Sequence, residues 1–194
     1  MIDELVAKRR SIRRFEDKKI DLSVLKNIVK CGRLYPSRGN RQPLKFILVD
    51  DEQMCGKIFD NILWGSKVSG YKIFNDKEYS PKAYILVLID KNITNAGYEY
   101  EMGASIQNML LCATENQIGS VWIKSADMKK IKELLEIEEN NIEIDSLIAL
   151  GYAKHTSKII EMEDSYNTII DDELNLNVPK RKERDIIFYN KYGN

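Results

Sequence analysis

Three separated loops of the chain combine basic side chains with amides and hydroxyls: residues 9–14, 37–42 and 180–182. A planar cofactor that carries a phosphate needs local positive charge for the phosphate. It also needs groups that both donate and accept hydrogen bonds at the edge of its heterocycle. Arginines are usually solvent-exposed surface residues without a binding role. That explanation accounts for any one of the loops about as well as a binding site does. Taken together, the three loops indicate a site for such a cofactor.

The usual catalytic motifs are absent from the sequence. It contains no Walker loop, no G-x-G-x-x-G after a strand, no nucleophile elbow and no H-E-x-x-H helix. His155 is the only histidine, and its setting after a strand, Gly-Tyr-Ala-Lys-His-Thr, predicts an exposed loop. A catalytic triad or a histidine-based metal centre would depend on this residue alone. Hydrolysis and zinc chemistry are therefore disfavoured.

Composition and length limit the class of protein. A chain of 194 residues with 43% apolar content predicts one domain, spanning residues 1–194. The 30 basic and 30 acidic residues balance, which argues against a nucleic-acid or membrane partner. The start of the chain lacks the layout of a secretory signal, no apolar run is long enough to cross a bilayer, and the three cysteines form no disulfide framework. We expect a cytoplasmic protein.

The first part of the chain predicts two helices, a loop and a strand. Apolar residues at helical spacing indicate a helix over residues 2–9. Asp21 can cap a second helix, and Gly32 stands where its C-terminal cap belongs. Two prolines and a glycine make residues 35–43 an irregular loop, and a strand over 45–50 follows.

The middle of the chain predicts the core of the sheet. Residues 84–89 are almost continuously apolar, which indicates a central strand buried on both faces. Residues 97–117 form the longest predicted helix, which Gly119 ends. Shorter elements follow: a strand over 121–123, a helix capped by Ser125 or Asp127 that runs to Leu135, and a strand over 146–151. Residues 155–177 are polar and acidic without a strong period, and an apolar tail follows over 186–189.

Several of these segments match one known family. The run Arg9-Arg10-Ser11-Ile12-Arg13 resembles the opening signature of the FMN-dependent nitroreductases, and residues 36–43 resemble their Pro-Ser-x-x-Asn-x-Gln-Pro loop. Residues 103–109 with 119–123, 149–152 and 179–181 are similar to the family's central helix and following strand, last strand and C-terminal phosphate contact. The resemblance covers nearly the whole chain. It implies an α/β (α+β) fold with a central mixed, mainly antiparallel sheet, flanking helices and a C-terminal tail that embraces a partner subunit.

The resemblance also implies which residues bind FMN. Arg9 and Ser11 would contact its phosphate end beside Arg10, and Arg13 would reach the pyrimidine edge and stabilise the reduced flavin. Three groups would complete the site: Pro36, Ser37, Arg38, Asn40 and Gln42 from the partner subunit; Ile123, Lys124 and Ser125 beside flavin N5, with a backbone N–H as donor; and Lys180 and Arg181 at the phosphate. The family therefore implies a homodimer with shared active sites.

The activity that follows from the resemblance needs no catalytic side chain, because the cofactor carries the bond-breaking chemistry. NADH or NADPH would pass hydride to the flavin and leave. A small electron-poor acceptor, such as a nitroaromatic, quinone or enone, would then take it in a ping-pong reaction. The alternative is a non-catalytic protein that stores or senses flavin.

The sequence departs from the family at positions that affect substrate choice. Leu44 stands where many members have tryptophan, and Lys124 and Ser125 stand where acidic residues or glycine are common. The short link between Ile89 and Gly97 leaves out the helical excursion that roofs the pocket in larger members. The aromatic residues within 64–79 form either part of the cover or ordinary core; they are Trp64, Tyr71, Phe74 and Tyr79. Asn75 is a candidate for the family's asparagine near the flavin edge, although the match needs a gap.

Overall fold

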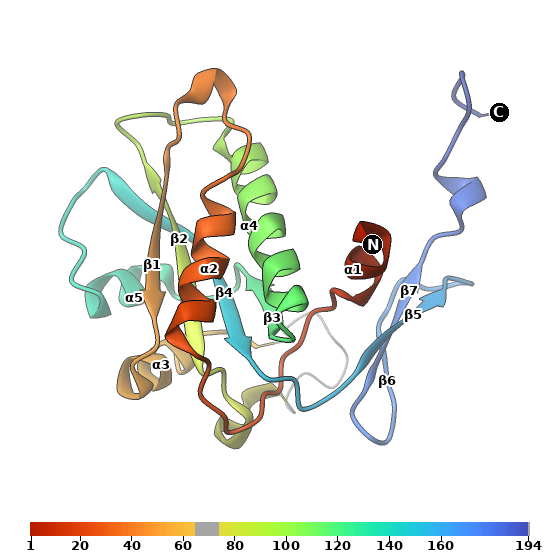
Figure 1. Cartoon of the computed structure of the whole chain (residues 1–194), viewed down its shortest axis with the longest axis horizontal. Coiled ribbons are helices and arrows are strands. Elements are labelled where there is room, and N and C mark those ends of the chain that lie inside the picture. The colour runs from red at the N-terminus through yellow and green to blue at the C-terminus, as the bar shows by residue number, and fades with distance from the viewer. Residues whose placement is uncertain (65–73, 194) are drawn as a thin grey trace.

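A computed structural model describes residues 1–64 and 74–193. Its main body is a four-stranded antiparallel sheet in the order β1-β2-β4-β3 (Figure 1). The strands are β1 (Leu44–Val49), β2 (Ala83–Asp90), β3 (Gly119–Ile123) and β4 (Ile142–Gly151). Helices α2 (Leu22–Gly32) and α4 (Tyr98–Glu115) cover one face, and α3 (Glu52–Phe59) and α5 (Met128–Leu134) cover the other. The predicted antiparallel sheet flanked by helices is confirmed.

Strand β2 lies between β1 and β4, and all of its residues are buried. Successive side chains point to opposite faces of a strand. Ile85 and Val87 accordingly pack toward α2 and α4, while Tyr84 and Leu86 join the core on the α3 side. This two-sided burial explains the unbroken apolar run and confirms the predicted central strand.

Gly32 does not have the predicted role of a C-terminal cap. Helix α2 begins after Asp21, whose carboxylate accepts from the N–H of Ser23 at 2.7 Å as expected, but it runs through Gly32 and ends at Arg33. A Cβ at Gly32 would lie 2.6 Å from the Cγ and Sδ atoms of Met109 on α4. The glycine is needed for the close approach of two helices.

Gly119 was also misassigned by the sequence pattern. The predicted helix over 97–117 is observed as α4 over Tyr98–Glu115, and the chain turns at Gln117, which has φ 60°. Gly119 is the first residue of β3, where a Cβ would lie 3.0 Å from Ile12 and 3.1 Å from the Gly151 carbonyl oxygen. It makes room for the N-terminal segment.

Two short helices complete the far face of the sheet. Helix α5 begins after Asp127, whose side chain accepts from the N–H of Lys130 at 3.0 Å, so Asp127 rather than Ser125 is the cap. Helix α3, which the sequence analysis did not predict, begins after Asp51 in the same way. The predicted first helix is α1 (Ile2–Lys8), and it has no buried residue.

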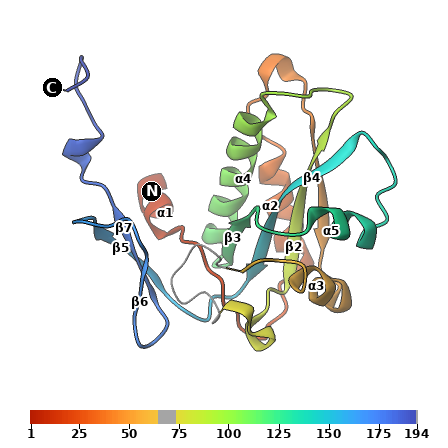
Figure 2. The ribbon, with the colours of Figure 1, turned by 180° about the vertical axis from the view of Figure 1, so that it is seen from behind.

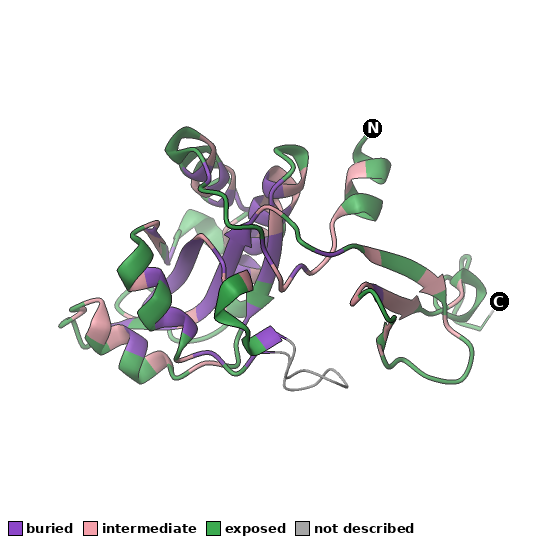
Figure 3. Cartoon of the chain, turned by 90° about the horizontal axis from the view of Figure 1, so that it is seen from below, coloured by how far each residue is buried: buried purple, intermediate pink, exposed green. Residues whose placement is uncertain are grey.

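Residues 155–177, for which the sequence pattern predicted no element, contribute strands. A second sheet in the order β5-β7-β6 consists of β5 (Ser157–Glu161), β6 (Ile169–Ile170) and β7 (Leu176–Lys180), with β5 and β7 parallel. It lies apart from the main sheet, with α1 between them (Figures 1 and 2). Most of it is exposed or half-buried, whereas buried residues fill the main body (Figure 3). None of the helices in the described part of the chain is long and apolar enough to cross a membrane.

The aromatic residues before β2 divide between core and surface. Trp64 and Phe74 are buried, and the Trp64 ring lies 5.2 Å from the ring of Phe59 on α3. Tyr79 is half-buried, and Tyr71 lies outside the described residues. The core interpretation therefore holds for Trp64 and Phe74.

Candidate functional site

The basic segment, residues 9–14, lies along the edge of the main sheet. Ser11 forms a parallel bridge with Ser120 at the start of β3, where the N–H of Ile12 donates to the Ser120 carbonyl at 2.9 Å. Phe15, which is fully buried, bridges Ala153 after β4. The buried side chains of Ile12 and Phe15 thus hold Arg13 and Arg14, which lie between them in the chain, at the edge of the sheet.

The arginines of the basic segment are partly desolvated. Burial lowers the pKa of Arg9 and of Arg13, and burial together with the charge of Arg9 lowers the pKa of Arg10. Among the described residues, no carboxylate forms an ion pair with the arginines of this segment, whereas Lys45 pairs with Asp90 at 2.9 Å. Neighbouring, partly buried cations without a counter-charge favour the binding of an anion.

A cavity of about 190 Å³ adjoins this segment. Lys8, Arg10, Gln117 and Ser157 contribute to its lining. The Nε atom of Arg10 and the Oγ atom of Ser157 are buried and have no hydrogen-bond partner among the described residues. Buried polar atoms are normally paired. These donors fit a ligand with acceptor oxygens, such as the phosphate of FMN.

Arg13 and Arg14 each lie over an aromatic ring. The Arg13 guanidinium carbon is 5.7 Å from the centre of the Phe74 ring, and that of Arg14 is 3.8 Å from the centre of Tyr79. The backbone N–H of Arg13 donates to Nε2 of His155 at 3.0 Å. His155 is buried, so the exposed loop predicted for it was wrong. Its burial depends on contacts with the N-terminal segment, which its own neighbourhood in the sequence does not reveal.

Residues 123–125 continue the chain from the end of β3, the strand that Ser11 of the basic segment bridges. Ile123 is buried, while Lys124 and Ser125 are exposed. Lys124 forms an ion pair with Asp145 on β4 at 3.0 Å, and the Ser125 carbonyl accepts from the N–H of Leu63 at 2.8 Å. Within the described chain, the N–H of Ser125 has no acceptor. The backbone here is fixed from two sides and leaves a donor free.

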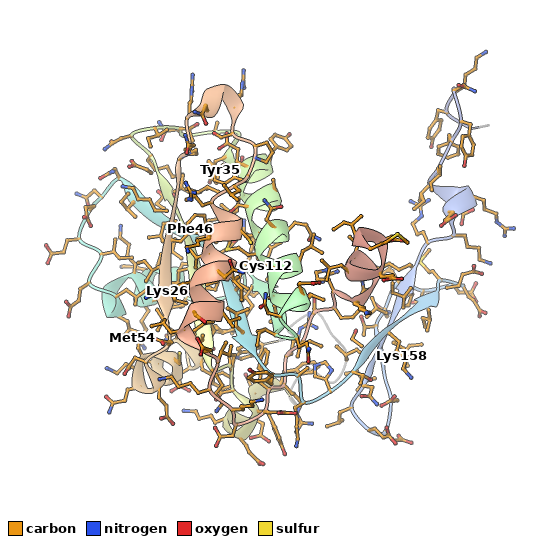
Figure 4. The ribbon with its side chains drawn as sticks, in the orientation of Figure 1. Lys26, Tyr35, Phe46, Met54, Cys112 and Lys158 are labelled. Carbon is orange, nitrogen blue, oxygen red and sulfur yellow. The ribbon has the colours of Figure 1, made fainter. Side chains whose placement is uncertain are left out.

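The Pro-Ser loop, residues 36–43, lies at the other end of the main body. Figure 4 labels Tyr35, just before the loop, at the end of α2 far from α1. The loop has a defined shape, because Ser37 Oγ accepts from the N–H of Gln42 at 2.9 Å and the Gln42 amide donates to Asn40 Oδ1 at 2.9 Å. Pro36 and Arg38 are exposed. One protomer therefore does not bring this loop to the basic segment.

Glu101 is a residue of this region that the sequence analysis missed. It is buried on α4, and its Oε1 atom accepts from the backbone N–H of Arg38 at 3.0 Å. The signal was present: an acidic residue falls on the apolar stripe of the longest helix, four residues before the buried Ser105. A carboxylate on a buried face requires a donor.

Lys180 and Arg181 lie at the exposed end of β7. Arg181 donates from Nη2 to the carbonyl of Asp185 at 3.0 Å. Within the described residues, neither side chain contacts Arg9 or Ser11 through a hydrogen bond. They are on the same side of the main body as α1, because the second sheet and α1 lie next to each other in both views (Figures 1 and 2).

The fold agrees with comparisons to known proteins. The model of the nitroreductase family matches residues 6–152. An Archaeoglobus fulgidus protein assigned as an NADH dehydrogenase/NAD(P)H nitroreductase is 33% identical over 173 residues, which are 84% of this chain and 92% of that protein. The chain belongs to the nitroreductase family, as the sequence motifs indicated.

Two further relatives show the range of the similarity. The iodotyrosine deiodinase of Thermotoga neapolitana is 25% identical over 166 residues, covering 78% of this chain and 88% of that protein. A Desulfovibrio desulfuricans protein, assigned as a nitroreductase and solved in complex with FMN, superposes with a TM-score of 0.65. It is 25% identical and covers 79% of this chain and 86% of its own.

Proposed function

We propose that this chain is an FMN-dependent NAD(P)H oxidoreductase that acts as a homodimer and reduces electron-poor acceptors such as nitroaromatics, quinones or enones. The observation that carries the proposal is the group of partly buried arginines at 9–14 with no paired carboxylate among the described residues. The phosphate of FMN is the counter-charge that this group needs. Relatives assigned as NAD(P)H nitroreductases support the redox function.

Each group of side chains has a separate task in this proposal. Arg9, Arg10 and Ser11 hold the phosphate, and Lys180 and Arg181 approach it from β7. The Arg13 guanidinium stabilises the negative charge of the reduced ring. When bound, FMN supplies the hydride chemistry, receiving hydride from NADH or NADPH and giving it to the acceptor in a second half-reaction.

The positions of the two halves of the site support the proposed dimer. The Pro-Ser loop, the orange loop after α2, lies at the end of the main body away from the basic segment (Figure 1). It contains Pro36, Ser37, Arg38, Asn40 and Gln42. In this proposal, the Pro-Ser loop of a second copy of the chain covers the flavin that the arginines and residues 123–125 hold. Exposed apolar residues on the C-terminal tail, Ile186, Ile187 and Tyr189, favour the same arrangement.

The visible spectrum of the purified protein tests the proposal. We expect bound FMN with flavin absorbance that bleaches when NADH or NADPH is added without oxygen and returns when a quinone is added. A protein that stores or senses flavin would keep its colour after the reductant is added. A protein that binds no FMN would contradict the proposal altogether.

A further inference from the structure

His155 connects the end of β4 to the basic segment. The residue is 7% exposed. Its Nε2 atom accepts from the backbone N–H of Arg13, and its Nδ1 atom lies 3.0 Å from the carbonyl oxygen of Thr156. The same carbonyl accepts from the N–H of Leu176 at the start of β7. The imidazole therefore joins the N-terminal segment to the second sheet.

These contacts define the protonation state of the ring. A carbonyl oxygen only accepts, so Nδ1 carries the proton and Nε2 is the bare acceptor of a neutral imidazole. A protonated ring donates from both nitrogens, and its Nε2–H would face the Arg13 N–H. The contact to Arg13 exists only while His155 is neutral.

The surroundings of the ring favour this neutral form. Burial lowers the pKa of His155 below its ordinary value of 6.5, the bond to Thr156 raises it, and the charges of Arg13 and Arg14 lower it further. Phe74, whose ring centre lies 6.5 Å away, and Thr156 bring no charge. The unfolded chain takes up the proton first as the pH falls. The contribution of His155 to stability is therefore complete above 6.5 and is lost as the pH falls through the lowered pKa.

We propose that His155 is a positioning residue, which fixes the backbone of Arg13, and with it the place of the guanidinium, only while its imidazole is neutral. The neighbouring N–H groups of Ile12 and Phe15 are held by the carbonyls of Ser120 and Tyr79, both outside this contact. The bond to His155 anchors Arg13, one of the two residues between them. The consequence for flavin rests on the proposed function, in which Arg13 stabilises the reduced ring.

Two substitutions separate the contacts of the imidazole. His155→Gln places an amide oxygen where Nε2 lies and does not titrate. His155→Asn keeps a donor near Thr156 but does not reach Arg13. At a pH well above 6.5, His155→Asn should lower the reduction potential of bound FMN and slow hydride uptake roughly three- to tenfold, the range of one hydrogen bond. His155→Gln should restore both.

The pH profiles then test the link to protonation. As the pH falls below 6.5, the native protein should approach the values of His155→Asn, whereas His155→Gln should not. The reduction potential of the flavin itself also changes with pH. Comparing the variants with the native protein at the same pH cancels this effect. Identical potentials and rates for His155→Asn and the native protein, or parallel profiles for the native protein and His155→Gln, would overturn the inference.

A measurement on the full chain without cofactor keeps this inference distinct from the proposed function. In amide NMR spectra, the Arg13 signal should titrate together with the His155 ring in the native protein and stay constant in His155→Gln. If the Arg13 amide signal does not change as the His155 ring titrates, the inference is rejected, even if FMN binds and is reduced. Failure to bind FMN rejects the proposed function, while the NMR titration still decides the role of His155.

Discussion

The carboxylate of Glu101 holds the backbone of Arg38, with 3.0 Å between Oε1 and the amide nitrogen. Glu101 is buried on α4, and Arg38 begins the short turn of the Pro-Ser loop. A charged acceptor in a buried site makes this a strong hydrogen bond. It fixes the loop to the longest helix of the main body.

We expect Glu101→Ala to weaken FMN binding by about tenfold or more, because a hydrogen bond to a charged group contributes about 1.5–3 kcal/mol. Titration of the apoprotein with FMN, followed by flavin fluorescence, measures the change. Glu101→Gln is the matched control, since its amide oxygen can still accept from Arg38. Unchanged affinity in Glu101→Ala would show that the loop does not depend on this bond.

Arg13→Ala should lower the reduction potential of the flavin and slow hydride uptake more than it weakens FMN binding. A cation that meets negative charge only after reduction stabilises the transition state and product selectively. Redox titration and stopped-flow reduction by NADH or NADPH measure these effects, with Arg13→Lys as the variant that keeps the charge. If FMN affinity alone fell and the potential matched that of the native protein, the assigned role of Arg13 would be wrong.

Replacing Lys180 and Arg181 together by alanine should weaken FMN binding by at least about tenfold, because each charge-assisted phosphate contact contributes roughly 1.5–3 kcal/mol. Riboflavin, which has no phosphate, should bind the double variant almost as well as the native protein. Parallel titrations with both ligands make the comparison. Equal losses would assign the residues to folding or dimerisation, and no loss would leave them as a solvated turn.

Sedimentation should show a flavin-loaded dimer whose interface buries roughly 2,000 Å² or more in total, as in obligate assemblies. Ile186, Ile187 and Tyr189 are about half exposed or more in the single chain, which favours their burial against a partner. Removal of the residues after Lys182 should shift the protein toward monomer and release FMN. A folded, flavin-loaded monomer would contradict the shared site.

Gly151→Ala should destabilise the protein by about 1–3 kcal/mol, the usual effect of overpacking a core. The added Cβ would lie 2.6–2.8 Å from three atoms of Phe15, one of them its own Cβ, and the fully buried Phe15 has little room to move. Gly56→Ala, within α3 and with no atom within 4 Å of the new Cβ, should instead stabilise by about 0.5–1 kcal/mol. Chemical unfolding compares the two, and a stable Gly151→Ala would mean that the basic segment shifts freely.

Sequence patterns predicted the helices and strands whose buried residues recur at regular intervals or whose ends are capped by nearby side chains. Strand β2 is apolar on both faces, α4 has a regular apolar stripe, and Asp21 and Asp127 cap helices through local contacts. Each of these features depends on near neighbours in the sequence. The second sheet was missed because β5 is mostly exposed and pairs with the distant β7.

Features that depend on distant contacts were not predictable from local pattern. Gly32 and Gly119 looked like helix caps, and their actual roles are set by Met109 and Ile12. Membership of the family was readable from its motifs. The role of His155 was not, because its partner Arg13 lies 142 residues earlier and no local pattern records that pairing.

The attachment of the basic segment to Ser120, Lys154 and His155 determines when the cofactor site can form during synthesis. The segment leaves the ribosome early, but its partners belong to the second half of the chain. Until β4 and His155 have emerged, Ile12 and Phe15 lack their buried positions, and such exposed apolar side chains make nascent chains prone to aggregation. The basic segment reaches its place on the sheet only after most of the chain has been translated, so the cofactor site is completed late in synthesis.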